Sequence, residues 1–345
     1  MAAITKYFIG GELEAFVQGS HASTTWTTSG GYYDSDFARG AVYLNTHNSF
    51  GYILMPLTAP QTTCWVSFQA LYSSNAFTTV HYWSFFNNVG GELLRVIQIG
   101  GTPAQPSMQF QYWSGAAWTA IGSGMVVPAN ARHKWDIQYL AAGSGGILRC
   151  YVDGLLMGSL TGNTSFISPA ALSEVHLYTT DGGGVDGTVA ISEAQVLDVS
   201  TLGRRLATLG ETANGINTAW TGAYTDINEV GTFNDSNFIQ SGTANQVSTF
   251  VTSDLSATAQ TYNVSGLVIA GRALNGAVGP QNLNGACVIG GTTYITTNNV
   301  AGPFGLPTVF GYVWADFPNN PATGVDFTPT EINTAGFETG WKSIT

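Results

Sequence analysis

Residues 132–158 read RHKWDIQYLAAGSGGILRCYVDGLLMG, and this stretch decides the fold. It reads as a strand over 132–139, a glycine-rich turn over 143–146, a strand over 147–152, and a further strand after the Asp153-Gly154 turn. Because glycine tolerates a positive φ, an Asp-Gly pair favours a two-residue hairpin turn. The stretch therefore predicts successive strands joined by tight turns.

The rest of the chain repeats this pattern. Apolar and polar residues alternate over 64–71, 94–99 and 108–113, which is the period of a strand with one buried face. Gly-Gly pairs punctuate these runs as turns between strands require. Short helices are predicted only at 202–209 and 330–335. Closely spaced strands without intervening helices predict an all-β sandwich or barrel.

The length of 345 residues favours two domains. The segment 191–197 reads as a last strand, and a new strand-rich region starts near Trp220. We predict an N-terminal jelly-roll β-sandwich over 1–198, a linker with a short helix over 199–218, and a smaller β-rich domain over 219–345. The predicted core of the first domain includes Trp135, Ile137, Leu148 and Val152.

Composition excludes several classes of protein. The net charge is −11 and no basic run occurs, so nucleic-acid binding is not expected. Only 9% of residues are charged and 44% are hydrophobic, which excludes a disordered chain. The three cysteines have no metal-ligand spacing and read as buried apolar residues. The N-terminus lacks a secretory signal and no apolar run is long enough to span a membrane, so we expect synthesis in the cytoplasm.

The 132–158 stretch resembles the laminin-G-like and concanavalin A-like jelly roll, where a Trp-led strand precedes a strand ending in VDG. The resemblance covers residues 1–198 in general layout. It implies two antiparallel sheets packed face to face. It also implies a carbohydrate or protein ligand at the loops or on one face.

Other segments are similar to tailed-bacteriophage structural proteins. They include GGELEAF at 10–16, WTGAYTDINE at 220–229, VSGLVIAGRA at 264–273 and PATGVDFTPTEIN at 321–333. This resemblance implies a virion component in which a second β domain follows a jelly roll. It does not distinguish head, tail or baseplate.

No catalytic motif is visible in the sequence. Jelly-roll glycanases carry carboxylates that alternate along one strand, so that one can attack while another donates a proton. The pairs Glu12/Glu14 and Asp34/Asp36 have this spacing but read as solvated surface pairs, and Glu193 has no partner two residues away. The five histidines are scattered without ligand spacing. We therefore predict that the chain is not an enzyme.

Two sets of residues are candidates for ligand binding. Tyr82, Trp83, Trp113 and Trp118 could stack on sugar rings, although aromatic residues at alternating strand positions also fit a core. Asp181 and Asp186 flank a run of glycines and could hold Ca²⁺, which takes oxygen ligands, although the same run fits a plain hairpin. No other cofactor is expected.

These observations predict a non-catalytic phage virion structural protein, assembled in the host cytoplasm. The alternatives are a receptor- or glycan-binding adhesin of the virion and, last, a polysaccharide-degrading enzyme. The stretch 273–315 has no charged residue, so we predict that domain 219–345 assembles with other virion proteins or as a homo-oligomer. The resemblance to a phage appendage implies three-fold symmetry. The segment 314–341 suggests an arm lying on a neighbour, or packing on its own domain.

Overall fold

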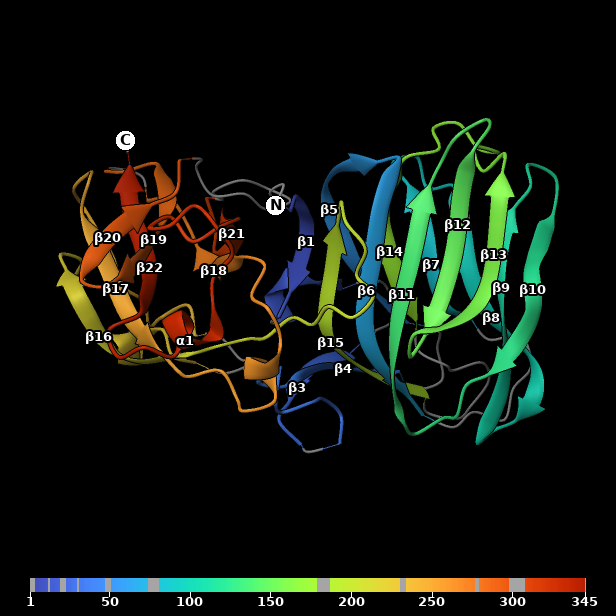
Figure 1. Ribbon diagram of the computed structural model, residues 1–345, viewed down its shortest axis with the longest axis horizontal. Helices are drawn as coiled ribbons and strands as arrows, with labels where there is room; N and C mark the ends of the chain where they lie inside the picture. Colours follow the sequence, from blue (N-terminus) through green and yellow to red (C-terminus); the bar gives the residue numbers. More distant parts are fainter. Residues whose placement is uncertain are drawn as a thin grey trace. The chain divides into compact units, whose positions relative to one another are not determined.

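The computed structural model confirms an all-β protein, with 55% of the described residues in strands and 4% in helices. Two compact units form, one from residues 6–206 and one from residues 207–345 with 1–5 (Figure 1). No helix in the described part of the chain is long and apolar enough to cross a membrane. The structure describes residues 4–11, 13–18, 23–29, 31–46, 51–73, 81–178, 187–229, 234–276, 279–297 and 308–344.

The first unit is a sandwich of two antiparallel sheets, as the resemblance to a jelly roll implies. The first sheet has eight strands in the order β13-β12-β11-β6-β15-β4-β3, with β1 also paired to β15. The second has seven in the order β10-β9-β8-β7-β14-β5-β2. The strands are β1 Lys6–Gly10, β2 Val17–Gln18, β3 Ser23–Thr27, β4 Ala41–Thr46, β5 Tyr52–Gln61, β6 Thr63–Tyr72, β7 His81–Asn87, β8 Glu92–Thr102, β9 Gln105–Trp113, β10 Trp118–Val126, β11 Arg132–Leu140, β12 Gly146–Val152, β13 Leu155–Gly162, β14 Leu172–Tyr178 and β15 Gly187–Leu197, with a 3-10 turn, η1, at Leu13–Ala15.

The turn between β12 and β13 forms as the Asp-Gly pair predicts. Asp153 and Gly154 have φ values of 51° and 78°, and Val152 pairs directly with Leu155. The Asp153 carboxylate accepts a hydrogen bond from the backbone N–H of Lys134 at 2.8 Å and lies 2.6 Å from Nδ1 of His133. The side chain that favours the turn therefore also ties it to β11.

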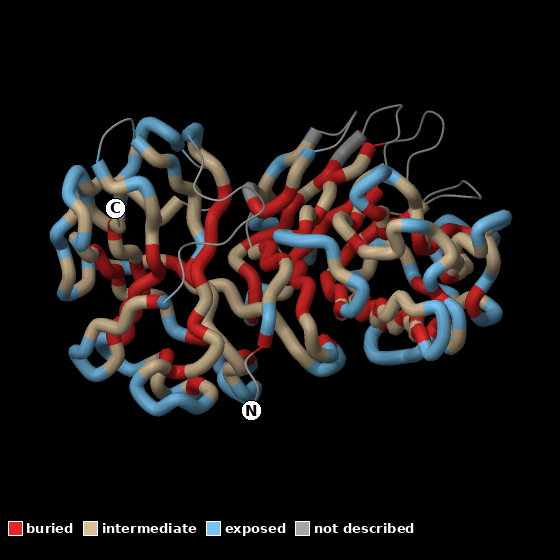
Figure 2. Tube along the Cα trace, turned by 90° about the horizontal axis from the view of Figure 1, so that it is seen from above, coloured by how far each residue is buried: buried red, intermediate tan, exposed pale blue. Residues whose placement is uncertain are grey.

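The predicted core residues Trp135, Ile137, Leu148 and Val152 are all buried, which confirms their placement between the sheets. Figure 2 shows buried positions concentrated along the strands of this unit. Trp83 from the opposite sheet meets Trp135 edge to face, with ring centroids 6.1 Å apart. Both rings are inaccessible to solvent, so they form the centre of the sandwich.

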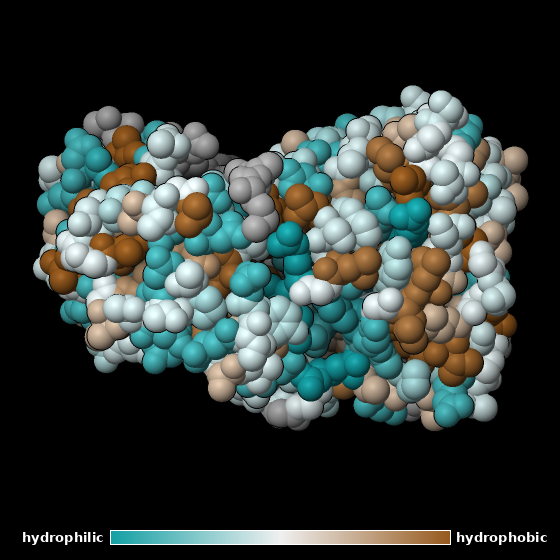
Figure 3. All heavy atoms as spheres, viewed as in Figure 1, coloured by the Kyte–Doolittle hydropathy of each residue, from teal (hydrophilic) through white to brown (hydrophobic). Residues whose placement is uncertain are grey.

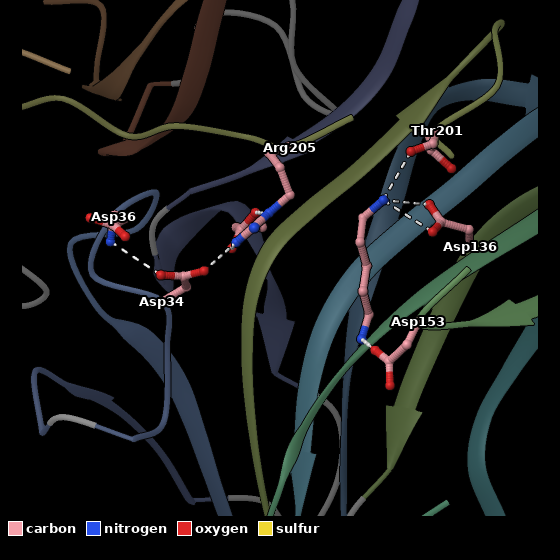
Figure 4. A network of polar contacts seen from close by, with 8 residues as sticks. Asp34, Asp36, Asp136, Asp153, Thr201 and Arg205 are labelled. Atoms are coloured by element: carbon pink, nitrogen blue, oxygen red, sulfur yellow. Dashed lines mark hydrogen bonds and ion pairs between the residues drawn. The ribbon is translucent and has the colours of Figure 1, made fainter. Parts of the chain in front are cut away.

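The segment after β15 is bound to the sandwich by ion pairs, and the helix predicted at 202–209 does not form. Arg205 donates to both carboxylate oxygens of Glu193 at 2.6 Å and to Asp34 at 2.8 Å (Figure 4). Its guanidinium also lies over the Phe37 ring, 3.7 Å from the ring centroid. Glu193 lies in a bulge of β15 with a φ of 53°. A bulge turns a side chain out of the strict alternation of a strand. At Glu193 it accompanies the contact with Arg205, whose own segment is extended rather than helical.

A second buried contact holds the same segment. Nζ of Lys134 donates to both oxygens of Asp136, at 2.9 and 3.0 Å, and to the backbone carbonyl of Thr201 at 2.9 Å (Figure 4). The Asp136 side chain is only 2% exposed, so the ammonium group supplies the positive charge that a buried carboxylate needs. Residues 199–206 therefore belong to the first unit, whereas the predicted linker extended to 218.

The second unit contains a five-stranded sheet in the order β16-β17-β22-β19-β20 and a two-stranded sheet, β18-β21. Strand β16 occupies part of the predicted linker. The segment 314–341 packs on its own unit rather than lying free as an arm, because β22 is the central strand of the five. The elements are β16 Glu211–Thr218, η2 Tyr224–Asp226, β17 Val247–Thr252, η3 Ala259–Thr261, β18 Leu267–Ala273, β19 Asn282–Ile289, β20 Thr292–Ile295, β21 Gly311–Phe317, α1 Pro329–Ile332 and β22 Glu338–Ile344.

A buried carboxylate fixes strand β16 in the second unit. Glu338 is 2% exposed and accepts hydrogen bonds from the backbone N–H of Ile216, at 2.9 and 3.0 Å, and from the Thr249 hydroxyl at 2.5 Å. A side chain at Gly215 would place its Cβ 2.1 Å from a Glu338 oxygen. Glycine is therefore required where β16 passes this carboxylate.

The central position of Trp135 predicts the effect of its removal. Replacing Trp135 with Ala leaves a cavity between the sheets and should lower the free energy of unfolding by about 3–5 kcal/mol. Urea denaturation followed by fluorescence measures this loss. The control is Trp65→Ala, since Trp65 is half-buried on the outer face of the same sheet. Equal stability of the two variants would contradict the placement of Trp135 in the core.

Candidate functional site

The four aromatic residues proposed from the sequence divide into two pairs. Tyr82 and Trp83 are 1% and 0% exposed, so neither ring offers a face to a sugar. Both rings pack against the opposite sheet, Tyr82 edge to face on Tyr72 and Trp83 edge to face on Trp135. Trp113 and Trp118 are half-buried and pair across the β9–β10 hairpin, with rings edge to face at 5.6 Å. Only this second pair remains available for stacking.

The proposed metal residues and the Glu12/Glu14 pair cannot be placed fully, since Glu12 lies outside the described residues and nothing is described of the Glu14 side chain. Asp181 and Asp186 lie outside the described residues, and a calcium site there stays a prediction. Within the described ranges, no three His, Cys, Asp or Glu side chains are grouped to hold a metal. Burial raises the pKa of Asp34, but the hydrogen bond and charge of Arg205 outweigh it and lower the pKa overall. Asp34 therefore serves the structural ion pair.

A polar cluster that the sequence analysis missed lies on the outer face of the seven-stranded sheet. On β7, Trp83 and Phe85 are buried in the core, which leaves Ser84 between them on the outer face. Ser84 pairs across the sheet with Arg95 of β8 and with His176 of β14. The polar cluster comprises His81, Ser84, Glu92, Arg95, Glu174, His176 and Tyr178.

Hydrogen bonds connect most of this cluster. The Ser84 hydroxyl bonds to Oε1 of Glu92, and Ser84 also bonds to Tyr178. Nδ1 of His81 lies 3.9 Å from the same Glu92 oxygen, and its Nε2 lies 3.4 Å from an Arg95 nitrogen. Because a guanidinium can only donate, Nε2 of His81 is the acceptor and the neutral ring carries its proton on Nδ1.

The ionisation of the cluster is strongly perturbed. Burial, reinforced by the charge of Arg95, lowers the pKa of His81 to about 4. Burial also raises the pKa of Glu92, against the opposing effects of Ser84 and Arg95. The pKa of Tyr178 is raised as well, mainly by burial. Perturbed groups of this kind, gathered on one face, mark a candidate functional site.

His176 lies beside this network between two aromatic rings. Tyr52 stacks on its imidazole at 4.5 Å with an interplanar angle of 6°, and Phe86 stacks at 4.1 Å and 26°. Its Nε2 lies 2.9 Å from Oε2 of Glu174. Burial lowers the pKa of His176 although Glu174 acts in the opposite direction. The ring is therefore held in one orientation by its neighbours.

Arg95 joins the polar cluster to the aromatic hairpin. The Trp118 ring lies over its guanidinium at 3.8 Å, and its Nε donates to Oε1 of Gln111 at 2.9 Å. Nε2 of Gln111 in turn donates to Gln109 at 2.9 Å. The face thus offers donors, acceptors and aromatic surface side by side. A ligand with both hydroxyl groups and apolar ring faces matches this combination.

The opposite outer face of the sandwich differs in character. Trp65 and Tyr151 stack there at 6.2 Å, and Leu156, which pairs with Tyr151, is 51% exposed. Figure 3 shows apolar side chains gathered over the part of the sandwich where β11, β12 and β13 lie. This apolar face provides matched control positions for tests of the polar cluster.

Comparisons with solved structures find distant similarity over part of the chain. No family model matches the chain, and no curated protein matches it. A sialidase shares 13% identity with a TM-score of 0.40, over 58% of this chain and 18% of its own. The alginate lyase Aly36B shares 11% with a TM-score of 0.38, over 56% and 99%. A carbohydrate esterase from the Shiga toxin-encoding bacteriophage phi24B shares 12% with a TM-score of 0.40, over 56% and 98%.

All three are named as carbohydrate-active enzymes. They contradict the prediction that the chain is not an enzyme. That exclusion rested on the absence of carboxylates alternating along one strand. The polar cluster instead draws its groups from three strands, which no motif search along one strand detects.

The low pKa of His81 predicts a specific titration. His81 should stay neutral down to about pH 4, and Arg95→Gln should raise its pKa towards the ordinary 6.5, because a neighbouring cation is removed. Unfolded His81 takes up a proton below its ordinary pKa, so the sandwich should lose stability as pH falls from 6.5 to 4. Histidine NMR titration measures the pKa in both proteins.

His81→Asn is the control for the loss of stability at low pH. The variant has no imidazole at position 81, so its free energy of unfolding should fall less between pH 6.5 and pH 4 than that of the wild-type protein. A His81 pKa near 6.5 in the wild-type protein would show that the ring is not held between Arg95 and Glu92.

Proposed function

We propose that the N-terminal sandwich binds a glycan on the outer face of its seven-stranded sheet. The observation that carries this proposal is the contact of Arg95 with Trp118 on one side and with Gln111 and His81 on the other. It places an aromatic ring, amide groups and a cation on one continuous face. The neighbouring Trp113 extends the aromatic surface by one ring.

A second function, chemical processing of the bound glycan, is favoured by the pair Glu92 and His81. Burial raises the pKa of Glu92 and lowers that of His81 to about 4, so burial favours the neutral form of both groups. A carboxyl group with a raised pKa keeps its proton to a higher pH than an ordinary carboxyl group and can donate it to a substrate. Glu92 would act as the acid, with the Ser84 hydroxyl bonded to it and neutral His81 3.9 Å away.

We further propose that this glycan recognition takes place on a phage particle, where the protein acts as a structural component or host-surface adhesin. The low charge of the chain and the segments similar to phage structural proteins support this proposal. The second unit would supply contacts to other virion proteins or to further copies. Its edge strand β16 exposes Ile216, which is 61% accessible.

Glycan binding predicts a difference between two tryptophan variants. Trp118→Ala should weaken binding to host-envelope polysaccharide about 10-fold, as loss of one aromatic contact does. Trp65→Ala, on the opposite face, should bind as the wild-type protein does. Calorimetry measures the affinity for the polysaccharide. An assay for new reducing ends measures processing, and its repetition with Glu92→Gln tests whether Glu92 is the acid. If only Trp65→Ala lost binding, the glycan site would lie on the eight-stranded sheet, and the proposed site would be wrong.

Assembly through the second unit predicts a concentration-dependent mass. Full-length protein should form a homo-oligomer in light scattering across a dilution series, and Ile216→Lys should shift it towards the monomer, because a charge on an edge strand opposes pairing. Ile99→Lys, an exposed position in the sandwich, is the control. A strictly monomeric wild-type protein at high concentration would count against self-assembly.

A further inference from the structure

Among the residues that the structure describes, no carboxylate lies within ion-pair distance of Arg95, and Glu92 acts on its pKa only through its charge. Its Nε donates to Gln111 at 2.9 Å, its Nη1 lies 3.4 Å from His81, and Trp118 covers one side of the guanidinium. Its Nη2 forms no hydrogen bond within the described ranges. One edge of the guanidinium therefore retains donors that these neighbours do not use.

Two other arginines show how this chain pairs a guanidinium. Arg205 binds Glu193 through Nε and Nη2, both at 2.6 Å, and Arg272 binds Asp235 through the same two nitrogens, both at 2.8 Å. Each of these pairs is two-pronged, the geometry that a planar carboxylate favours. Arg95 departs from this arrangement.

The groups around Arg95 do not neutralise its charge fully. His81 is uncharged at neutral pH, since its pKa is about 4. Glu92 is bonded to Ser84 rather than to Arg95, and burial raises its pKa. Burial also lowers the pKa of Arg95 itself, which shows that its charge is partly desolvated. An anion placed at this edge would therefore be stabilised.

The surroundings indicate which molecule carries that anion. Trp113 and Trp118 offer ring faces, and Gln109 and Gln111 offer amide groups, beside the guanidinium. These features suit a sugar, and a sugar carboxylate has two oxygens that match a guanidinium edge. With a net charge of −11, the chain does not attract polyanions over long distances, so recognition must be local.

We propose that Arg95 is the carboxylate-binding residue of a subsite for acidic glycans on this face. The proposal rests on the glycan-binding function above and adds the chemical class of the ligand. Trp118 would hold the guanidinium in place and contact the sugar ring, while Gln111 fixes the orientation of Nε. The free edge of Arg95 would then receive the carboxylate without rearrangement of the sheet.

The test changes the protein and the ligand together. Polygalacturonate and hyaluronate are each prepared intact and with their carboxyl groups reduced to alcohols, and both forms are titrated into wild-type protein and Arg95→Gln. We expect reduction to weaken binding to the wild-type protein at least about 10-fold for at least one of the two polymers, since one charge-assisted pair is lost. Arg95→Gln should bind the intact polymer as weakly as the wild-type protein binds the reduced one.

Arg95→Gln should bind the intact and the reduced polymer equally, so that the preference for the carboxylate is lost, whereas Trp65→Ala on the opposite face should keep that preference. Equal weakening for both forms of the polymer would overturn the proposal and make Arg95 a residue that only positions its neighbours. Equal binding of intact and reduced polymers would overturn it while leaving glycan binding intact. If the wild-type protein bound dextran sulfate as tightly as it binds polygalacturonate or hyaluronate, Arg95 would be a site for anions in general, and the proposed preference for a carboxylate would be wrong. Binding of host polysaccharide but of neither polymer would also overturn it.

Discussion

The aromatic contact between the two sheets is the constraint on which the sandwich depends. Trp83 of β7 meets Trp135 of β11 at 6.1 Å, and Phe85 meets Tyr139 at 6.0 Å, so two successive inward positions of β7 face two of β11. Because side chains alternate along a strand, fixing these rings inside fixes the intervening residues outside. Ser84 is therefore committed to the outer face, and its cross-strand partner Arg95 is placed there with it.

Bulges modify this rule where the polar cluster forms. Strand β7 has register irregularities between His81 and Trp83 and between Phe85 and Phe86. A bulge turns a side chain out of strict alternation, and such features concentrate near functional sites. Here they allow His81 and Glu92 to approach each other, at 3.9 Å, from neighbouring strands. The same irregularities hide the cluster from a search for period-2 motifs.

The chain has few charges and uses them in two ways. Arg205 with Glu193, and Lys134 with Asp136, join paired charges at buried positions and bind residues 199–206 to the sandwich. Arg95 instead stacks on Trp118 and bonds to a neutral amide. A paired charge with little exposure stabilises a fold. A charge without a full partner on an accessible face is available to a ligand, and this difference separates the structural networks from the candidate site.

The sequence by itself determined the fold class, the Asp153-Gly154 hairpin and the burial of Trp135, Ile137, Leu148 and Val152. These features follow from local signals: period-2 alternation, a residue pair that tolerates positive φ, and apolar residues on one face. The helix expected at 202–209 failed because ion pairs to distant residues outweighed a weak local preference.

Tertiary structure alone decided the candidate site. His81, Arg95 and His176 are far apart in the chain and follow no spacing rule, and they meet because β8, β7 and β14 are neighbours in the sheet. It also decided that Tyr82 and Trp83 are core residues while Trp113 and Trp118 are accessible, although all four look alike in sequence. Strand order is set by long-range packing, and one face of a strand becomes core or surface only when a second sheet covers it.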